Sequence, residues 1–187
     1  MNRRRAVFLD RDGVLNRAIV RAGRPHSPAS LDELVVPDGV LDALARLRAA
    51  GFLLLGATNQ PEVARGRQRR EIVEAMHAAL LARLPLEAIL VCYHDDPDAC
   101  DCRKPRPGLL LQAADRYNVN LLASVMVGDR WKDVEAGRRA GCATVLLGDG
   151  WGEPGYGSAP DFTAATLTEA AAWILRRAAA GDRDGGG

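Results

Sequence analysis

The chain has 187 residues, of which 48% are apolar and 26% are charged, and its formal net charge is +1. These values are typical of one folded globular domain, and the balanced charge gives no support to a nucleic-acid-binding surface. No apolar run approaches the roughly 18 residues that cross a membrane, and the first residues lack the apolar stretch of a signal peptide. We therefore expect a cytoplasmic monomer with a single domain over residues 1–177 and a disordered tail over residues 178–187.

Strand patterns and helical patterns alternate along the chain. The first strand is Ala6–Leu9, and Pro37 and Asp38 open the first helix, which Gly51 ends. The next predicted elements are a strand at Phe52–Ala57, a helix at Arg69–Leu84, a strand at Ala88–Cys92, a helix at Gly108–Tyr117, a strand at Val125–Val127, a helix at Asp133–Ala140, a strand at Ala143–Leu147 and a helix at Leu167–Arg177. This order predicts an α/β fold, with a parallel sheet covered on both faces. Ligands of such sheets bind beyond the carboxyl ends of the strands.

Two carboxylates follow the first strand directly. In extended chain Asp10 and Asp12 point to the same side, and Gly13 permits a turn that many residues could not take. Carboxylates in this position can bind a hard cation, attack an electrophile or transfer a proton. The plain alternative is a polar turn that caps the strand.

Three further groups of reactive side chains follow in order along the chain. They are Thr58 and Asn59 after the second strand, Arg103 and Lys104 ahead of the helix at Gly108, and Asp129 after the fourth strand, with Asp133 one helical turn later. Gly128-Asp129 alone could be an ordinary strand-to-helix cap. Four such groups, three of them at predicted strand ends, predict one shared site.

This set of residues resembles the four motifs of the haloacid-dehalogenase (HAD) superfamily. The resemblance rests on Asp10-x-Asp12-Gly13, Thr58-Asn59, Lys104 and Gly128-Asp129-x-x-x-Asp133, and it extends from about Ala6 to Leu147. It implies a three-layer Rossmann-like fold. It also implies a Mg²⁺-dependent phosphatase that works through an aspartyl-phosphate.

The resemblance assigns chemical roles to five residues. Asp10 would be the nucleophile, and Asp12 would protonate the leaving oxygen and then activate water. Lys104 would neutralise charge, while Thr58 and Asn59 would donate hydrogen bonds to the phosphoryl oxygens. Phosphoryl transfer depends mainly on positioning and charge neutralisation, so these roles suit the chemistry.

The same resemblance implies a magnesium site. Asp10, Asp129 and the backbone carbonyl of Asp12 would hold Mg²⁺, with Asp133 and Arg130 placed around these ligands. Mg²⁺ prefers oxygen ligands and keeps several waters, so two carboxylates and one carbonyl suffice.

A second metal site is predicted by the cysteines. Cys92-x-His94, five residues and then Cys100-x-Cys102 offer three thiolates and one imidazole, a set that fits a closed, structural Zn²⁺ site. The alternative is three unrelated buried cysteines and a surface histidine. Cys142 stands apart in an apolar run and is expected to be a core thiol.

The motifs also resemble one branch of the superfamily, subfamily IIIA. The stretches FLDRDGVLN, ATNQ, ARG, the cysteine loop, CRKPRPG and VGDRWKD are similar to those of the bacterial heptose bisphosphate phosphatases and histidinol-phosphate phosphatases. The likeness implies small loops instead of a large cap domain, and zinc that braces the loop carrying Arg103 and Lys104. It further implies a sugar bisphosphate substrate and removal of the 7-phosphate from D-glycero-D-manno-heptose 1,7-bisphosphate.

Two segments depart from the heptose branch in places expected to touch the substrate. Pro61–Val63 replaces the usual Ser-Gly-Ile, and Arg17–Arg21 replaces an acidic turn that contains His-Gly-Tyr. Gln60 is expected to contact the substrate. Arg103, and after it Arg65, is expected to bind a second phosphate, since guanidinium groups pair well with phosphate oxygens.

Three alternatives stay open. A histidinol-phosphate phosphatase would use the same chemistry on a substrate with one phosphate. A DNA-end 3′-phosphatase would need a basic groove that the net charge does not suggest. A non-catalytic zinc-binding interaction domain could also keep this fold, but it would not need the complete set of catalytic residues.

Overall fold

The centre of the molecule is a six-stranded parallel sheet. The computed structural model describes residues 3–153 and 159–184. The strand order is β5-β4-β1-β6-β7-β8, with the bounds β1 Ala6–Leu9, β4 Leu53–Asn59, β5 Ala88–Cys92, β6 Val125–Gly128, β7 Ala143–Leu147 and β8 Phe162–Ala164. From β1 the chain adds β4 and β5 on one side and then returns to add β6 on the other. The carboxyl ends of β4, β1 and β6 therefore meet at the point where the winding reverses, which is where such sheets bind ligands.

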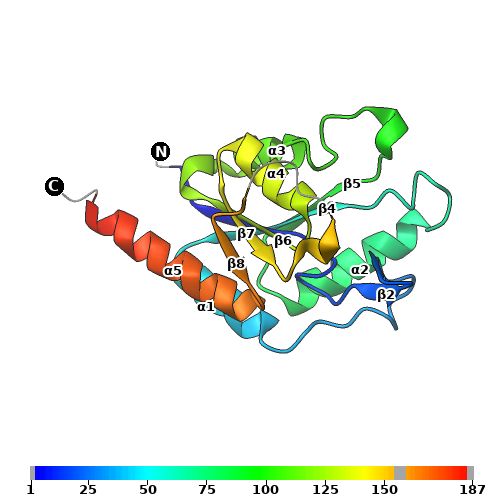
Figure 1. The fold of residues 1–187 in the computed structure, drawn as a ribbon, viewed down its shortest axis with the longest axis horizontal. Helices are drawn as coiled ribbons and strands as arrows, with labels where there is room; N and C mark the ends of the chain where they lie inside the picture. Colours follow the sequence, from blue (N-terminus) through cyan, green and yellow to red (C-terminus); the bar gives the residue numbers. More distant parts are fainter. Residues whose placement is uncertain (1–2, 154–158, 185–187) are drawn as a thin grey trace.

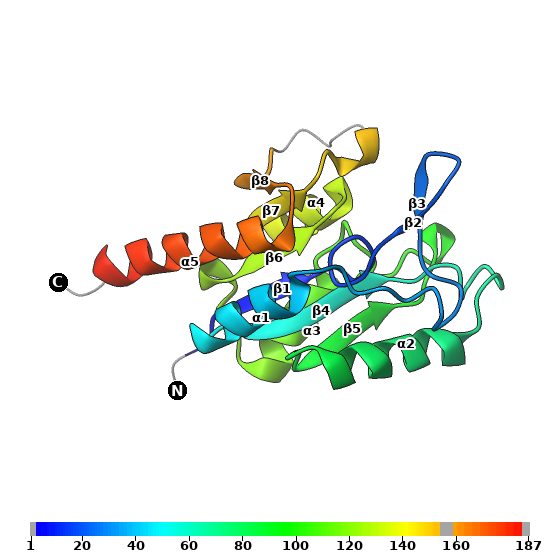
Figure 2. The ribbon, with the colours of Figure 1, turned by 90° about the horizontal axis from the view of Figure 1, so that it is seen from below.

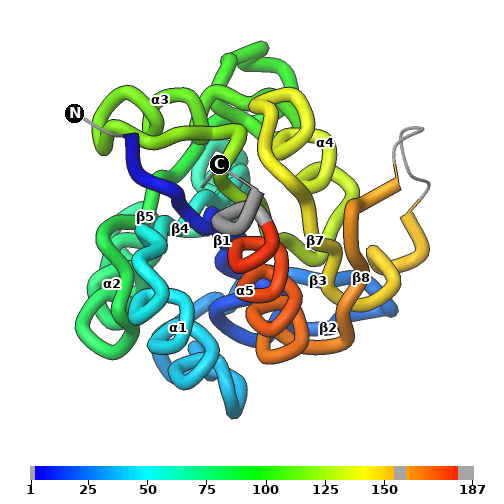
Figure 3. Tube along the Cα trace, turned by 90° about the vertical axis from the view of Figure 1, so that its left-hand side faces the viewer, coloured from blue at the N-terminus to red at the C-terminus, as the bar shows by residue number. Residues whose placement is uncertain are grey.

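Helices cover both faces of this sheet (Figure 1). Figure 3 shows α3 (Gly108–Tyr117) and α4 (Trp131–Ala140) on one side, and α1 (Val40–Ala49), α2 (Arg70–Arg83) and α5 (Leu167–Asp184) on the other. The residues of β1 alternate between the two cores, because successive side chains of a strand point to opposite faces. Val7 and Leu9 pack in the core with α1, α2 and α5, while Ala6 and Phe8 pack in the core with α3. The predicted three-layer α/β fold is confirmed.

A small antiparallel hairpin lies beyond the carboxyl end of the sheet (Figure 2). It pairs β2 (Ile19–Arg21) with β3 (Arg24–His26). Ala22 and Gly23 in its turn both have positive φ, at 49° and 71°, as a two-residue hairpin turn requires. Neither this hairpin nor β8 was predicted from the sequence, since three-residue strands carry too little periodicity to recognise.

The last helix is longer than predicted. It continues to Asp184 instead of ending at Arg177, because the three alanines at 178–180 favour helix. Residues 178–184 thus belong to α5 and not to the predicted disordered tail, and the rest of that tail lies outside the described residues. Within the described part of the chain, no helix has the length and apolar character needed to cross a membrane.

Candidate active site

Three carboxylates meet at the carboxyl edge of the sheet. Asp10 follows β1, Asp129 follows β6, and Asp133 lies in the first turn of α4. One oxygen of each lies within 4.8 Å of the others, and all three residues are at most 9% exposed. Gly128 makes this approach possible, because a Cβ at that position would lie 2.1 Å from the Cβ of Asp133.

Lys104 is the buried cation of this acidic cluster. Its Nζ lies 2.9 Å from Asp10 Oδ1, and it donates hydrogen bonds to Asp133 Oδ1 at 2.5 Å and to the carbonyl of Ala57 at 2.7 Å. Burial alone would lower the pKa of Lys104, but Asp10 and Asp133 outweigh that effect and raise it. The lysine is therefore held as a cation against the oxygens of two carboxylates.

One lysine does not balance three buried acids. Burial, aided by the charges of Asp133 and Asp12, raises the pKa of Asp10 to about 6 even though Lys104 opposes the shift. Burial and the charges of Asp10 and Asp133 raise the pKa of Asp129 to about 8. A divalent cation would relieve this repulsion.

The hydrogen bonding of Asp129 also fits a metal ion. Trp151 Nε1 donates a 2.7 Å hydrogen bond to Asp129 Oδ2. The other oxygen, Oδ1, is buried and has no hydrogen-bond partner among the described residues. A buried carboxylate oxygen without a partner is costly, and a hard cation such as Mg²⁺ is a natural ligand for it. Asp10 and Asp129 therefore fit the magnesium site that the resemblance implied, and the third carboxylate beside them is Asp133.

The carboxylate of Asp12 is turned away from this acidic cluster. Arg11 binds it through two nitrogens, at 3.0 and 3.1 Å. Asn16, Ser27 and Gln60 donate three further hydrogen bonds of 2.7–3.0 Å. Burial would raise the pKa of Asp12, but Arg11 and these three donors hold it below its ordinary value. These contacts favour the carboxylate form of Asp12.

Two of the predicted substrate-binding residues use their amides within the protein. Asn59 Nδ2 donates to the Lys104 carbonyl at 2.9 Å, and Asn59 Oδ1 accepts from the Lys104 amide at 3.1 Å. Gln60 Nε2 donates to both Asp12 and Thr58, and Gln60 is not among the residues that line the cavity. These contacts position Lys104, Asp12 and Thr58. The local sequence did not reveal this positioning role of Asn59 and Gln60.

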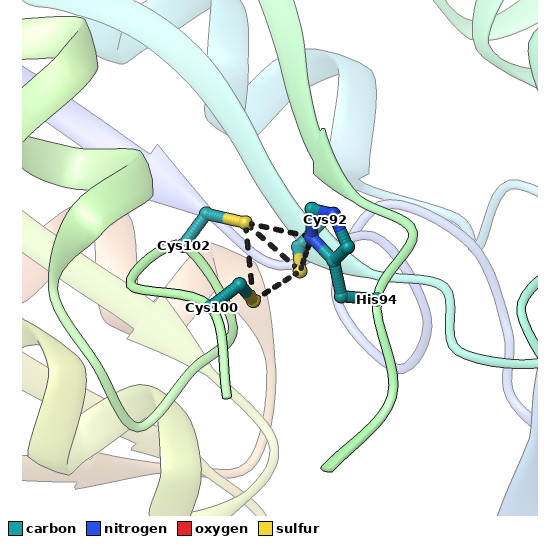
Figure 4. A group of neighbouring side chains, drawn as sticks. All are labelled: Cys92, His94, Cys100 and Cys102. Carbon is teal, nitrogen blue, oxygen red and sulfur yellow. Dashed lines mark hydrogen bonds between the residues drawn. The ribbon is translucent and has the colours of Figure 1, made fainter. Parts of the chain in front are cut away.

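The predicted zinc ligands converge (Figure 4). The sulfurs of Cys92, Cys100 and Cys102 are 3.1–3.6 Å apart, and His94 Nδ1 lies 3.6 Å from Cys92 Sγ and 3.4 Å from Cys102 Sγ. All three cysteines are free thiols. In a tetrahedral Zn²⁺ site with Zn–S bonds of about 2.3 Å, neighbouring sulfurs lie slightly farther apart than these 3.1–3.6 Å distances. The four side chains can therefore hold one such ion. Cys142 is a buried core thiol, as predicted.

The two arginines expected at a second phosphate are in ion pairs. Arg103 is 8% exposed and binds Asp96 through Nε at 2.7 Å, with Asp95 at 3.5 Å. Arg65 binds Asp95 and Glu62, each at 2.6 Å. Both arginines still line the cavity of about 620 Å³ above the acidic cluster, within the range of small-molecule sites.

Comparison with known proteins agrees with this geometry. Residues 101–170 match a protein-family model described as HAD-hydrolase-like. The chain is 38% identical over 154 residues to the D-glycero-beta-D-manno-heptose-1,7-bisphosphate 7-phosphatase of Pseudomonas aeruginosa, a match that covers 80% of this chain and 84% of that protein. The Escherichia coli (strain K12) protein of the same name is also 38% identical over 154 residues, with 76% and 78% covered. The chain is a HAD-family phosphatase.

A solved relative of this HAD phosphatase supports the fold over most of the chain. The D,D-heptose 1,7-bisphosphate phosphatase from B. bronchiseptica, crystallised with magnesium and phosphate, matches with a TM-score of 0.78 and 35% identity. The match covers 92% of this chain and 99% of that chain.

Several residues that contact the site of this HAD phosphatase were not predicted from the sequence. Ser27, from the segment after β3, reaches Asp12, and the buried His77 of α2 lies 3.2 Å from the Arg11 guanidinium. Burial, together with Arg11, lowers the pKa of His77 to about 4, so the neutral ring accepts this hydrogen bond. Trp151 comes from the turn after β7. No local pattern marks these residues, because each lies far in sequence from the group that it contacts.

Proposed function

We propose that this HAD phosphatase removes the 7-phosphate of D-glycero-D-manno-heptose 1,7-bisphosphate through an aspartyl-phosphate. The observation that carries the chemistry is the convergence of Asp10, Lys104 and Asp129 at one edge of the sheet. The substrate is supported by the names of the relatives that share 38% identity with the chain. The cavity, with both acids and cations in its lining, suits a small phosphorylated metabolite.

In the first step, an oxygen of Asp10 attacks phosphorus and the bond from phosphorus to the leaving oxygen breaks. Lys104 and the Arg11 amide both bind Asp10 Oδ1, which leaves Oδ2 for the attack. Asp12, in its acid form, gives its proton to the leaving oxygen. Lys104 and Thr58 face the charge on the transferring group.

In the second step, water replaces the carboxylate. Asp12, now ionised, takes a proton from water, and the water oxygen bonds to phosphorus as the Asp10 O–P bond breaks. Inorganic phosphate leaves and Asp10 is restored. The contacts of Asp12 with Arg11, Ser27 and Gln60 correspond to the carboxylate form that this step uses.

Two metal ions complete the proposal. Asp10, Asp129 and the Asp12 carbonyl would hold Mg²⁺, with Asp133 and Arg130 beside them, and the ion would neutralise phosphoryl charge. Cys92, His94, Cys100 and Cys102 would hold Zn²⁺. This second site leads directly into Arg103 and Lys104, so zinc would fix the segment that presents Lys104 to Asp10.

A bisphosphate also suits the cations at the cavity mouth. Arg65 and Arg103 are the proposed contacts for the second phosphate, although each must share its guanidinium with an acid. Lys132 lines the same cavity. Burial, and after it the charges of Arg103 and Arg130, lower the pKa of Lys132, and an anionic group bound beside Lys132 would oppose that shift.

The decisive experiment compares kcat/KM in Mg²⁺ for the heptose bisphosphate and for histidinol phosphate. We expect a preference of at least about 100-fold for the bisphosphate, because histidinol phosphate has no second phosphate to bind the cations at the cavity mouth. A preference for histidinol phosphate would reject the substrate and keep the phosphatase chemistry. Hydrolysis of neither compound would reject both the heptose and the histidinol assignments.

A further inference from the structure

A short turn after β7 is held against the proposed magnesium ligand Asp129. Trp151 lies at its centre, and its indole Nε1 donates to Asp129 Oδ2 at 2.7 Å. The same residue lines both the cavity of about 620 Å³ above the acidic cluster and a neighbouring cavity of about 360 Å³. Trp151 and Asp129, joined by this hydrogen bond, therefore border both cavities.

The backbone of this turn is strained. Trp151 has φ 61° and ψ 27°, a left-handed conformation that non-glycine residues rarely adopt. Gly150 and Gly152 on either side also have positive φ, at 71° and 62°. A bulky residue keeps such a conformation only where its surroundings determine it.

Two contacts determine the conformation of this turn. The Trp151 amide donates to Asp149 Oδ1 at 2.9 Å. At the other end, Glu153 forms an ion pair with Arg130, whose own amide donates to Asp133 Oδ2 at 3.1 Å. The turn is thus tied to the residue directly after Asp129 and, through it, to the start of α4.

We infer that Trp151 is a positioning residue, which fixes Asp129 so that Oδ1 is the oxygen presented to a divalent cation. The indole occupies Oδ2, and Oδ1 is the buried oxygen that has no partner among the described residues. The inference rests on the magnesium site of the proposed function. It concerns which oxygen of Asp129 binds the cation, and it does not depend on the identity of the substrate.

The test measures Mg²⁺ binding by isothermal titration calorimetry, without substrate. Trp151→Phe keeps an aromatic ring and removes the N–H. We expect its Kd for Mg²⁺ to rise by about tenfold, as expected when a hydrogen bond to a charged group is lost. Trp173→Phe is the matched control, because Trp173 stacks on Phe162, with ring centroids 5.3 Å apart, and lines neither of the two cavities. Its Kd should equal that of the wild type.

A second variant keeps the test valid if Trp151→Phe fails to fold. Asp149→Ala removes the acceptor of the Trp151 amide and retains the indole, and we expect a rise in Kd of about threefold from the loosened turn. Wild-type affinity in both variants would overturn the inference and leave the proposed function intact. Absence of Mg²⁺ binding by the wild type would overturn the proposed metal site and the inference together.

Discussion

Gly13 lies directly against Asp129, since a Cβ on Gly13 would be 2.0 Å from Asp129 Oδ2. Gly13 also has φ 86°, so Gly13→Ala adds both a clash and backbone strain of about 1–2 kcal/mol. We expect turnover in Mg²⁺ to fall by more than about 100-fold, as misplaced catalytic groups do. Gly51→Ala separates the two effects, because Gly51 has φ 85° with nothing within 4 Å of its Cβ position. That variant should lose stability and keep its kcat, and equal losses of kcat in the two variants would refute this account.

Asp10→Asn should abolish turnover on every substrate, by more than about 1,000-fold. The amide is a poor nucleophile, and it also lacks the charge that Lys104 binds at 2.9 Å. Circular dichroism should show an intact fold. Asp115→Asn, at an exposed position of α3, is the matched control and should leave kcat unchanged. Residual activity near the wild-type value in Asp10→Asn would discard the nucleophile assignment.

The stability of the Mg²⁺-free protein should fall as pH rises from 6.5 to 8.5. The pKa of Asp129 is about 8 in the folded protein, against an ordinary value of 3.8. Across this window the unfolded chain has released a proton that the folded protein still holds, so the free energy of unfolding decreases with pH. Below pH 6.5 the lowered pKa of His77 acts in the opposite direction, which sets the lower limit of the window.

Thermal unfolding of Mg²⁺-free protein at several pH values checks this prediction. Asp129→Asn has no such proton to lose and should show a flatter profile between pH 6.5 and 8.5. Added Mg²⁺ should raise Tm more at pH 8 than at pH 6.5, because protons compete with the metal. A wild-type profile no steeper than that of Asp129→Asn would contradict the prediction.

Cys102→Ser should remove zinc from the purified protein. With the site incomplete, we expect a stability loss of about 3 kcal/mol and a Tm lower by roughly 6–12 °C. Faster amide hydrogen exchange should be confined to residues 92–104, which depend on the ion for their arrangement. Cys142→Ser, at the buried thiol outside the cluster, should retain full zinc content by elemental analysis. If wild-type protein purified without chelator contains no zinc, the proposed zinc site is refuted.

Arg103→Ala should impair hydrolysis of a sugar bisphosphate more than that of a small artificial monophosphate, by about tenfold or more in kcat/KM. Because Arg103 also binds Asp96 at 2.7 Å, the variant could instead disturb the zinc loop. Asp96→Asn breaks the same ion pair and keeps the guanidinium, so it should spare the bisphosphate preference. Equal losses on both substrates in Arg103→Ala would remove this residue from substrate recognition.

The order of the elements, and which polar residues meet at the carboxyl edge of the sheet, were readable along the chain. The strands Ala6–Leu9, Ala88–Cys92 and Ala143–Leu147 have the predicted bounds, because each is a short, largely apolar run that a change in residue type ends clearly on both sides. Parallel strands bring their carboxyl ends to one edge. Acids that directly follow β1 and β6 must therefore meet, and the cysteine spacing defines its cluster in the same local way.

Only the tertiary structure decided which partner each charged side chain takes. Asp12 lines the same cavity as Asp10 and Asp129. Its carboxylate binds Arg11, however, and it is Asp133 that joins the acidic cluster. The binding of Trp151 to Asp129 likewise depends on a turn 22 residues away in sequence. Local patterns fix where a backbone segment begins and ends. The choice among several charged partners is set by burial and by distances of a few ångströms, and these exist only once the layers have packed.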